Sequence, residues 1–312
     1  MDWKTIDCQY LLPRFAASFL LSVGGKSVFV ENNTTHAVPL LIQALRASGN
    51  SPESVEWLVV THAHLDHAGG TSALAKLCPN ATVLAHPKAA KSLREPTRLI
   101  ESAKKVYGEA EFLRLYGTIE AIPANRIREV KDEETLVWQG RTFEFLHTLG
   151  HASHHFCMID RAASSMFTGD AFGVCYPDLR GRSPFHFPSS SPIDFDAVEA
   201  MRTLERLTET QVETAYLTHF GPVRELKDRA KQMKNHIQAH QEFIQMADES
   251  QIEDDEVEGF ILSKLTEYFK KCLEEHQIPW NDENRELLKL DLNLNASGLA
   301  YQCLKRRKQK PC

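Results

Sequence analysis

The residues best suited to metal chemistry lie in one stretch, residues 61–70, which reads Thr-His-Ala-His-Leu-Asp-His-Ala-Gly-Gly. It contains three histidines and an aspartate within six residues: His62, His64, Asp66 and His67. Imidazole and carboxylate are the ligands expected for zinc or iron, and less often for manganese. In an extended segment, side chains at even spacings point the same way, so His62 and His64 can hold one ion. Asp66 and His67 can turn toward a second ion.

These candidate ligands need a structural element on either side to position them. The apolar run 55–60 predicts a strand ahead of them, and Gly69-Gly70 leads into a helical pattern over 71–77. An aspartate among histidines beside a buried strand needs partners that offset its desolvation, and a metal ion supplies them. The alternative, a cluster of surface or core histidines without a metal, explains this spacing less well.

The pattern His-x-His-x-Asp-His resembles that of the metallo-β-lactamase-fold hydrolases. Three further segments follow in the order known for that family, each after a strand-like run: Gly150-His151, Thr168-Gly169-Asp170 and Thr218-His219-Phe220-Gly221. The resemblance covers roughly residues 14–224. It implies an α/β (α+β) fold, a four-layer αββα sandwich.

The resemblance also implies a ligand set for two divalent ions, with zinc expected first and iron or manganese as alternatives. One ion is expected on His62, His64 and His151, the other on Asp66, His67 and His219, with Asp170 bridging both. Two adjacent cations lower the pKa of a bound water toward ~7, which makes hydroxide available as a nucleophile. The resemblance also makes Asp66 and Asp170 the expected catalytic carboxylates, and it implies that Asp66 relays a proton to the leaving group.

One position departs from the family pattern. Members usually carry Asp-Gly or Asp-Thr-Gly after the second strand, whereas this chain reads Glu31-Asn32-Asn33. We expect Glu31 to take the role of supporting the metal ligands.

Turn-forming residues and the spacing of apolar residues indicate how the chain is organised. Gly24-Gly25 between two β-rich runs predicts a hairpin. We expect a catalytic domain over 1–224, with a helical insertion at about 88–117, and a helical region over 225–312. Within that last region, the apolar spacing predicts a long helix from 225, a second around 261–272, and two more at 282–290 and 297–304.

A loop over 172–188 follows Asp170 and is rich in proline, glycine and aromatic residues. As a candidate wall of the substrate pocket it offers Tyr176, Arg182, Phe185 and His186. The insertion at 88–117 is either a packing helix pair or a lid over the site. His86 and His240 are interpreted as structural histidines rather than ligands.

The net charge, the lengths of the apolar runs and the cysteines bear on the class of protein and its location. The chain has 312 residues and a formal net charge of −6, which argues against a nucleic-acid partner. No apolar run approaches the roughly 20 residues of a membrane span, and the N-terminal residues lack the pattern of a signal peptide. The seven cysteines form no Cys-x-x-Cys pair and are interpreted as reduced thiols of a cytoplasmic protein. A homodimer stays open.

The expected function is a metal-dependent hydrolase that cleaves a thioester or an ester/lactone bond of a small molecule with a dinuclear-metal-bound hydroxide. The helical C-terminus is similar in architecture to that of glyoxalase II (hydroxyacylglutathione hydrolase) and of the quinolone-signal thioesterase. Two alternatives are kept: a phosphodiesterase of the same fold, and a regulatory binding protein that retains the metal site. Diiron flavoproteins of this fold carry a Glu in place of His64 and are excluded on that ground.

Overall fold

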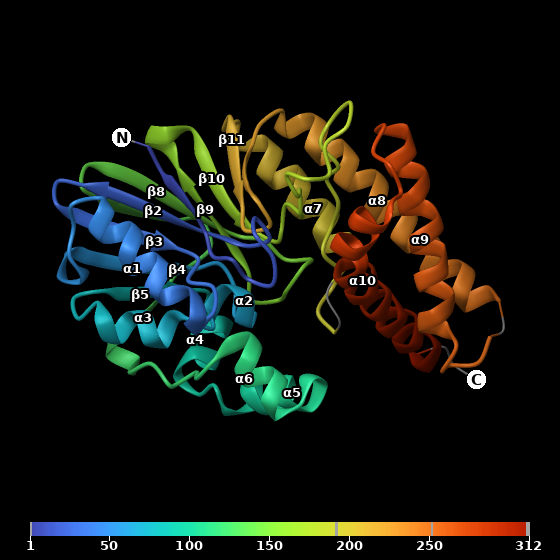
Figure 1. Ribbon diagram of the computed structural model, residues 1–312, viewed down its shortest axis with the longest axis horizontal. Helices are drawn as coiled ribbons and strands as arrows, with labels where there is room; N and C mark the ends of the chain where they lie inside the picture. Colours follow the sequence, from blue (N-terminus) through green and yellow to red (C-terminus); the bar gives the residue numbers. More distant parts are fainter. Residues whose placement is uncertain (1, 191–192, 251, 310–312) are drawn as a thin grey trace. The chain divides into compact units, whose positions relative to one another are not determined.

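The computed structural model describes residues 2–190, 193–250 and 252–309, which form two compact units. The first unit comprises residues 1–147, 154–169 and 211–224, and the second comprises 148–153, 170–210 and 225–312. All the named strands lie in the first unit, and helices α7 to α10 lie in the second (Figure 1). The predicted domain boundary at residue 224 stays a prediction, since this division assigns two earlier segments to the unit that holds the C-terminal helices.

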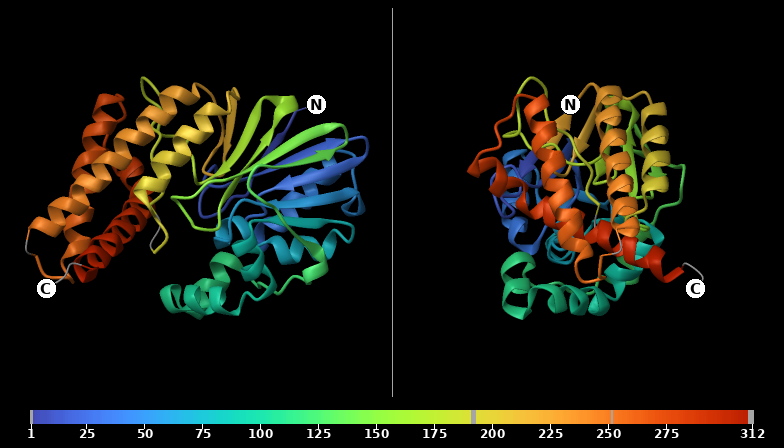
Figure 2. Two further views of the ribbon diagram at one scale, coloured as in Figure 1. Left: turned by 180° about the vertical axis from the view of Figure 1, so that it is seen from behind. Right: turned by 90° about the vertical axis from the view of Figure 1, so that its right-hand side faces the viewer.

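The first unit contains two six-stranded sheets (Figure 2). The first sheet has the order β1 (Lys4–Asp7), β2 (Ala17–Val23), β3 (Lys26–Val30), β4 (Val55–Val60), β5 (Thr82–Ala85) and β6 (Ile127–Glu129). The second has the order β12 (Gly221–Val223), β11 (Thr214–Leu217), β10 (Ser165–Gly169), β9 (Phe156–Asp160), β8 (Arg141–His147) and β7 (Glu134–Trp138). Strands β3 to β6 run parallel, as do β10 and β11.

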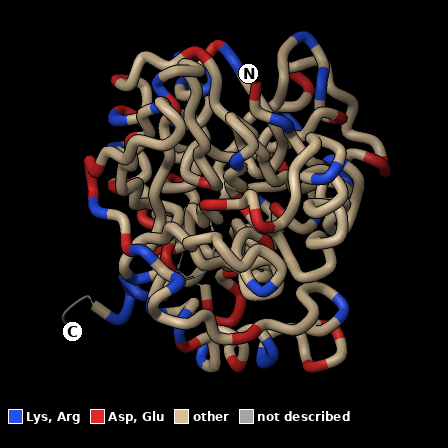
Figure 3. Tube along the Cα trace, turned by 90° about the vertical axis from the view of Figure 1, so that its left-hand side faces the viewer, with Lys and Arg blue, Asp and Glu red and all other residues tan. Residues whose placement is uncertain are grey.

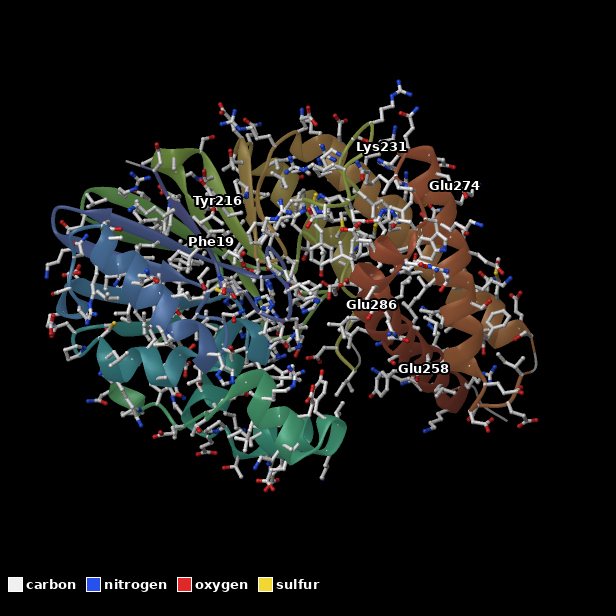
Figure 4. The ribbon with its side chains drawn as sticks, viewed as in Figure 1. Phe19, Tyr216, Lys231, Glu258, Glu274 and Glu286 are labelled. Atoms are coloured by element: carbon white, nitrogen blue, oxygen red, sulfur yellow. The ribbon has the colours of Figure 1, made fainter. Side chains whose placement is uncertain are left out.

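Alternation along β4 explains how its sheet is covered on both faces. Leu58 and Val60 face an apolar cluster that includes residues of helices α1 (Val38–Ala47) and α3 (Thr71–Leu77), whereas Val59 faces a second cluster. That second cluster joins the sheets: Phe19 of β2 and Tyr216 of β11 lie with ring centroids 5.2 Å apart (Figure 4). The continuous apolar run of β4 is thus that of a strand buried on both faces.

The insertion predicted at 88–117 is helical, as expected, but it consists of three short helices rather than two. They are α4 (Pro87–Arg94), α5 (Thr97–Tyr107) and α6 (Glu109–Tyr116), and the short α2 (Leu65–Ala68) completes the helices of this unit. Pro96, the N-cap of α5, and Gly108, between α5 and α6, separate them. The predicted hairpin at Gly24-Gly25 is confirmed by the pairing of β2 with β3.

The second unit consists of α7 (Ala197–Glu209), α8 (Leu226–Glu249), α9 (Val257–Glu275) and α10 (Asp282–Gln309). Helices α8, α9 and α10 pack against one another (Figure 2). Each contributes fully buried apolar residues, such as Ile237, Leu265 and Leu288. The two helices predicted at 282–290 and 297–304 are wrong as separate elements, because α10 continues through both. The stretch between the two predicted helices contains Asn295, whose amide is buried and bonds to Pro188 O and Ser190 N. Tertiary contacts therefore override the local preference.

Charged residues of both signs are interspersed along the chain (Figure 3). Within the part of the chain that the structure describes, no helix is long and apolar enough to cross a membrane. The six described cysteines are free thiols, and five of them are buried. Cys312 lies outside the described residues.

Buried histidines mark the interior of the second unit. The His240 ring lies 3.0 Å from Ser190 Oγ through Nδ1 and is fully buried, which confirms its structural interpretation. Burial lowers the pKa of His240 to about 3, of His236 to about 3 and of His186 to about 4. These rings are therefore neutral in the folded protein at neutral pH.

This arrangement predicts acid sensitivity. An unfolded histidine binds a proton below its ordinary pKa of 6.5, whereas folded His240 does so only near 3, so stability is lost as the pH falls through that window. Each such group contributes a slope of up to about 1.4 kcal/mol per pH unit. Urea unfolding between about pH 5 and pH 7 should show a smaller slope in His240→Gln than in the wild type, and the same slope in a control at exposed His36, His36→Gln. An unchanged slope in His240→Gln would show that this ring does not couple folding to protonation.

Candidate metal centre

The ligand loop begins directly where β4 ends. His62 is fully buried, His64 lies at the N-cap of α2 in an extended conformation, and Asp66 and His67 lie on α2 itself. The rings of His62 and His64 lie 4.5 Å apart, as expected for side chains at even spacing in an extended segment. The transition from strand to helix separates this pair from Asp66 and His67. The sequence analysis predicted a helix only after Gly70, so the short helix α2 that carries them was not predicted.

Asp66, His67 and His219 converge in the first unit. Their candidate ligand atoms lie within 4.8 Å of one another. His67 Nε2 is 3.8 Å from Asp66 Oδ2, and His219 Nε2 is 3.4 Å from the same oxygen. His219 follows β11, so two strand ends that are far apart in the sequence supply this triad.

The other nitrogen of each ring shows which atoms face the triad. His219 Nδ1 lies 2.7 Å from Phe15 O, a carbonyl that only accepts, so Nδ1 carries the proton and Nε2 carries a lone pair. His67 Nδ1 lies 2.7 Å from the Glu31 carboxylate, with the same consequence. Two lone-pair nitrogens and a carboxylate oxygen thus point at each other, an arrangement that a divalent cation satisfies. The residues fit the metal that the resemblance implies.

Glu31 holds His67 in this orientation. Its side chain is buried, with Oε2 bound to His67 Nδ1 and Oε1 accepting from Thr61 N at 3.0 Å. Such a carboxylate–histidine contact fixes the ring and raises the basicity of the nitrogen that faces the metal. The supporting role expected for Glu31 therefore matches its position.

The loop after β3 is packed closely against the ligand loop. Asn32 N donates to His67 O at 2.9 Å, and Gly70 N donates to Asn33 O at 2.6 Å. A Cβ at Gly70 would lie 2.4 Å from Asn32 O, which no side chain tolerates. The second glycine of the motif is thus required by this approach of two backbones.

Two histidines that the sequence analysis did not single out lie beside the ligand loop. His154 Nδ1 accepts from Ala63 N at 3.3 Å, and its ring lies 5.6 Å from that of His64. His155 is fully buried, and its ring lies 4.8 Å from that of His62. Their adjacency to His151 in the sequence was the one available signal.

The second unit contains the other two predicted ligands, His151 and Asp170. His151 Nδ1 lies 3.0 Å from Ser189 O, so its Nε2 carries the lone pair, and this Nε2 is 3.6 Å from Asp170 Oδ2. Both residues are buried. The pair repeats the arrangement found at His219, with a carbonyl on one side of the ring and a carboxylate on the other.

The four residues proposed for the pocket wall differ in their burial and in their contacts. Phe185 and His186 are fully buried within the second unit; Phe185 packs on Phe269 of α9, and His186 bonds to Phe172 O. The Tyr176 hydroxyl is 3.1 Å from Asp291 of α10, and Arg182 is exposed. These contacts make Phe185 and His186 part of the loop's internal packing. His86 caps α4 by accepting from Lys88 N at 3.1 Å, in keeping with a structural role.

Glu31 gives a direct test of this support. Replacing it by alanine leaves the His67 ring N–H and the Thr61 N–H buried without an acceptor, which costs about 1–3 kcal/mol for each group. We expect Glu31→Ala to lower metal affinity by about 10–100-fold in titrations with a competing chelator. Glu31→Gln, which keeps the shape and an acceptor for Thr61, should lose less, and Glu53→Ala, away from the ligand loop, should lose nothing. Equal affinity in Glu31→Ala and the wild type would contradict the supporting role.

Comparison with known proteins gives the family. A model of the metallo-beta-lactamase superfamily matches residues 23–219. The metallo-beta-lactamase fold-containing protein ST1585 of Sulfurisphaera tokodaii is 27% identical over 187 residues, covering 58% of this chain and 67% of the relative.

Solved structures share the fold at lower identity. The archaeal superfamily protein ST1585 from Sulfolobus tokodaii matches with a TM-score of 0.64 and 21% identity, over 95% of this chain and 97% of the other. TTHA1429 from Thermus thermophilus matches with a TM-score of 0.65 and 19% identity, over 98% and 93%. The BLEG-1 B3 metallo-beta-lactamase matches with a TM-score of 0.55 and 17% identity, over 74% and 97%. The predicted αββα fold with C-terminal helices is confirmed, and the chain belongs to the metallo-beta-lactamase superfamily.

Proposed function

We propose that this protein is a metal-dependent hydrolase that cleaves a thioester or an ester/lactone bond in a small molecule. The observation that carries the proposal is the convergence of His67 Nε2 and His219 Nε2 on the Asp66 carboxylate, each ring fixed through its Nδ1. The His151–Asp170 pair, in which the ring is likewise fixed through its Nδ1, supplies two more of the family positions.

We further propose that seven residues form one dinuclear ligand set: His62, His64, Asp66, His67, His151, Asp170 and His219. The donor chemistry of this set suits two divalent ions, with zinc first and iron or manganese as alternatives. When bound, such ions supply Lewis acidity and lower the pKa of water toward ~7.

The chain's own residues supply positioning and proton transfer. The rings of His67 and His219 are held by Glu31 and by the Phe15 carbonyl, so the ligand geometry is set before any substrate arrives. The side chain of Asp66 is 28% exposed, unlike the buried rings beside it. It is therefore the carboxylate that a leaving group can reach, and we propose that it moves a proton there.

The cysteines support a solvent nucleophile. Burial raises the pKa of Cys8 and of Cys78 to about 12 and that of Cys175 to about 11, so these thiols are protonated at neutral pH. Free, mostly buried thiols also fit the cytoplasmic location that we propose.

The reaction class is tested with a panel of substrates. Zinc-loaded protein should hydrolyse a simple thioester or a lactone faster than a phosphodiester such as bis-p-nitrophenyl phosphate. Phosphodiester turnover alone would favour the phosphodiesterase alternative. Full metal occupancy with no turnover of any substrate would favour the regulatory binding protein.

Asp66 tests the proposed proton transfer. Asp66→Asn should lower kcat for the hydrolysed substrate by on the order of 100-fold or more, because the amide cannot carry the proton. The loss should be larger for a poor leaving group, such as an alkyl thiol, than for a thiophenol, which needs no protonation. A matched change at exposed Asp255, Asp255→Asn, should leave kcat unchanged. A loss in Asp66→Asn that is equal for both leaving groups would assign Asp66 to metal binding alone.

The thiols give an independent test. Replacing each cysteine in turn by serine should leave kcat within about twofold wherever metal content is retained, because solvent supplies the attacking oxygen. Any single variant that keeps its metals and loses turnover would contradict the solvent nucleophile.

A further inference from the structure

Four aromatic side chains of the first unit connect the metal ligand His219 to the inserted helices. The ring of Phe15 lies edge-on to His219 at 5.6 Å and 6.2 Å from Tyr10. Tyr10 stacks on Tyr116 at 6.3 Å, and Tyr116 meets Tyr107 at 5.9 Å. We call Tyr10, Phe15, Tyr107 and Tyr116 the aromatic wall. It runs from the Asp66–His67–His219 triad to α5 and α6.

The segment that carries Tyr10 and Phe15 is held in a strained conformation. Gln9, Leu11 and Arg14 have φ values of 53°, 59° and 57°. Residues other than glycine seldom adopt such positive φ angles. The Asp7 carboxylate closes this loop by accepting from Gln9 N and Arg14 N, both at 2.9 Å. Such strain persists where surrounding contacts enforce it, and it clusters at sites that bind ligands. Here it places Tyr10 against Tyr116.

The other side of the wall is unusually exposed. Helix α5 has no fully buried residue, although Leu99, Ile100 and Ala103 pack partly against the cluster that contains Tyr116. Tyr107, at the end of α5, keeps 38% of its surface exposed, and Val106 beside it keeps 75%. The short α5–α6 insertion therefore presents apolar and aromatic surface rather than covering it, which is typical of a binding surface.

The hydroxyl groups of Tyr10 and Tyr116 are neutral hydrogen-bond donors. Tyr10 and Tyr116 hydrogen-bond to each other, and both lie near enough to Asp66 to sense its charge. Burial, with a smaller contribution from Asp66, raises the pKa of both tyrosines above the ordinary value. The wall thus offers flat apolar faces with a few polar groups, the composition of small-molecule subsites.

Two of the cations near the wall, Arg114 and Lys104, are paired with glutamates. Arg114 lies near Tyr10, but its Nε donates to Glu111 at 2.7 Å. Lys104 donates to Glu109 at 2.8 Å while its ammonium lies 5.7 Å above the Phe112 ring. Neither cation is presented to a phosphate or carboxylate on the substrate.

We propose that the aromatic wall is the subsite for an aryl group on the acyl side of the substrate, so that the enzyme prefers arylacyl esters or thioesters to short alkyl ones. The inference rests on the proposed function and names its substrate class. Aryl rings fit this surface because offset and edge-to-face ring pairs at 4.5–7 Å are favourable, and the wall already consists of rings at such spacings.

The test compares two thioesters of the same thiol, S-phenylacetyl- and S-acetyl-N-acetylcysteamine. Zinc-loaded wild type should prefer the phenylacetyl substrate in kcat/KM. Tyr107→Ala should lower this preference by about tenfold, chiefly through KM, without changing acetyl turnover. Tyr301→Ala on α10 is the matched control, because Tyr301 is 40% exposed against 38% for Tyr107, and it should keep the full preference. Because Tyr107 is exposed, its removal should leave the fold intact.

Binding separates this inference from the proposed function. Calorimetry with phenylacetate and acetate should show tighter binding of phenylacetate to zinc-loaded wild type, with the difference lost in Tyr107→Ala. If that difference appears but neither thioester is hydrolysed, the subsite stands and the proposed hydrolase function fails. If both thioesters are hydrolysed with equal kcat/KM, or if Tyr107→Ala keeps the preference, the subsite is refuted while the hydrolase function stands.

Discussion

A single buried carboxylate, Glu31, connects the end of β4 to the proposed metal ligand His67. Its two oxygens bind the backbone of Thr61, at the end of β4, and the ring of His67, on α2. An isolated carboxylate is very costly to bury, so Glu31 is tolerable in this interior only with both partners in place. The conformation of the ligand loop and the orientation of the His67 ring therefore depend on the same carboxylate. The contacts of Asn32 and Gly70 close the same junction through the backbone.

The parallel strands explain why the ligands gather at the ends of strands. Strands β3 and β4 are parallel neighbours, and the loops after them carry Glu31 and the ligand motif. Strands β10 and β11 are parallel neighbours in the second sheet; Asp170 follows β10 directly, and His219 comes two residues after β11. Functional side chains in such sheets collect beyond the carboxyl ends of strands, where loops vary without disturbing the core. The buried apolar runs of β4 and β10 make those ends rigid.

Much of this arrangement was predictable from local patterns. The motif at 61–70, the glycine pair of the hairpin and the apolar run of β4 each specify their structure over a few residues. The contact between Glu31 and His67 could not be predicted in this way, because the two residues are far apart in the sequence and no local pattern links them. His154 and His155 were missed because no spacing rule links them to His62 and His64. The prediction of two separate helices within α10 was wrong for a similar reason: the contacts of Asn295 with residues 188 and 190, far away in the sequence, stabilise the continuous helix.

The loop at 172–188 stays a predicted wall of the substrate pocket. Two of its four candidate residues, Phe185 and His186, are buried by packing within the second unit. The aromatic wall that we propose as a subsite lies in segments whose composition gives no such signal, the residues around Tyr10 and the end of α5. The aromatic wall differs from the 172–188 loop in its contact with a proposed metal ligand: Phe15 contacts His219 through both its ring and its carbonyl.

The central claim is a dinuclear centre formed by the seven proposed ligands. Anomalous diffraction from crystals grown with zinc, recorded on both sides of the zinc absorption edge, tests it most directly. The account predicts two zinc peaks about 3.5–4 Å apart, one bound by His67 and His219, with Asp170 between the two. A single peak, or zinc bound elsewhere with the triad of Asp66, His67 and His219 left empty, would contradict it.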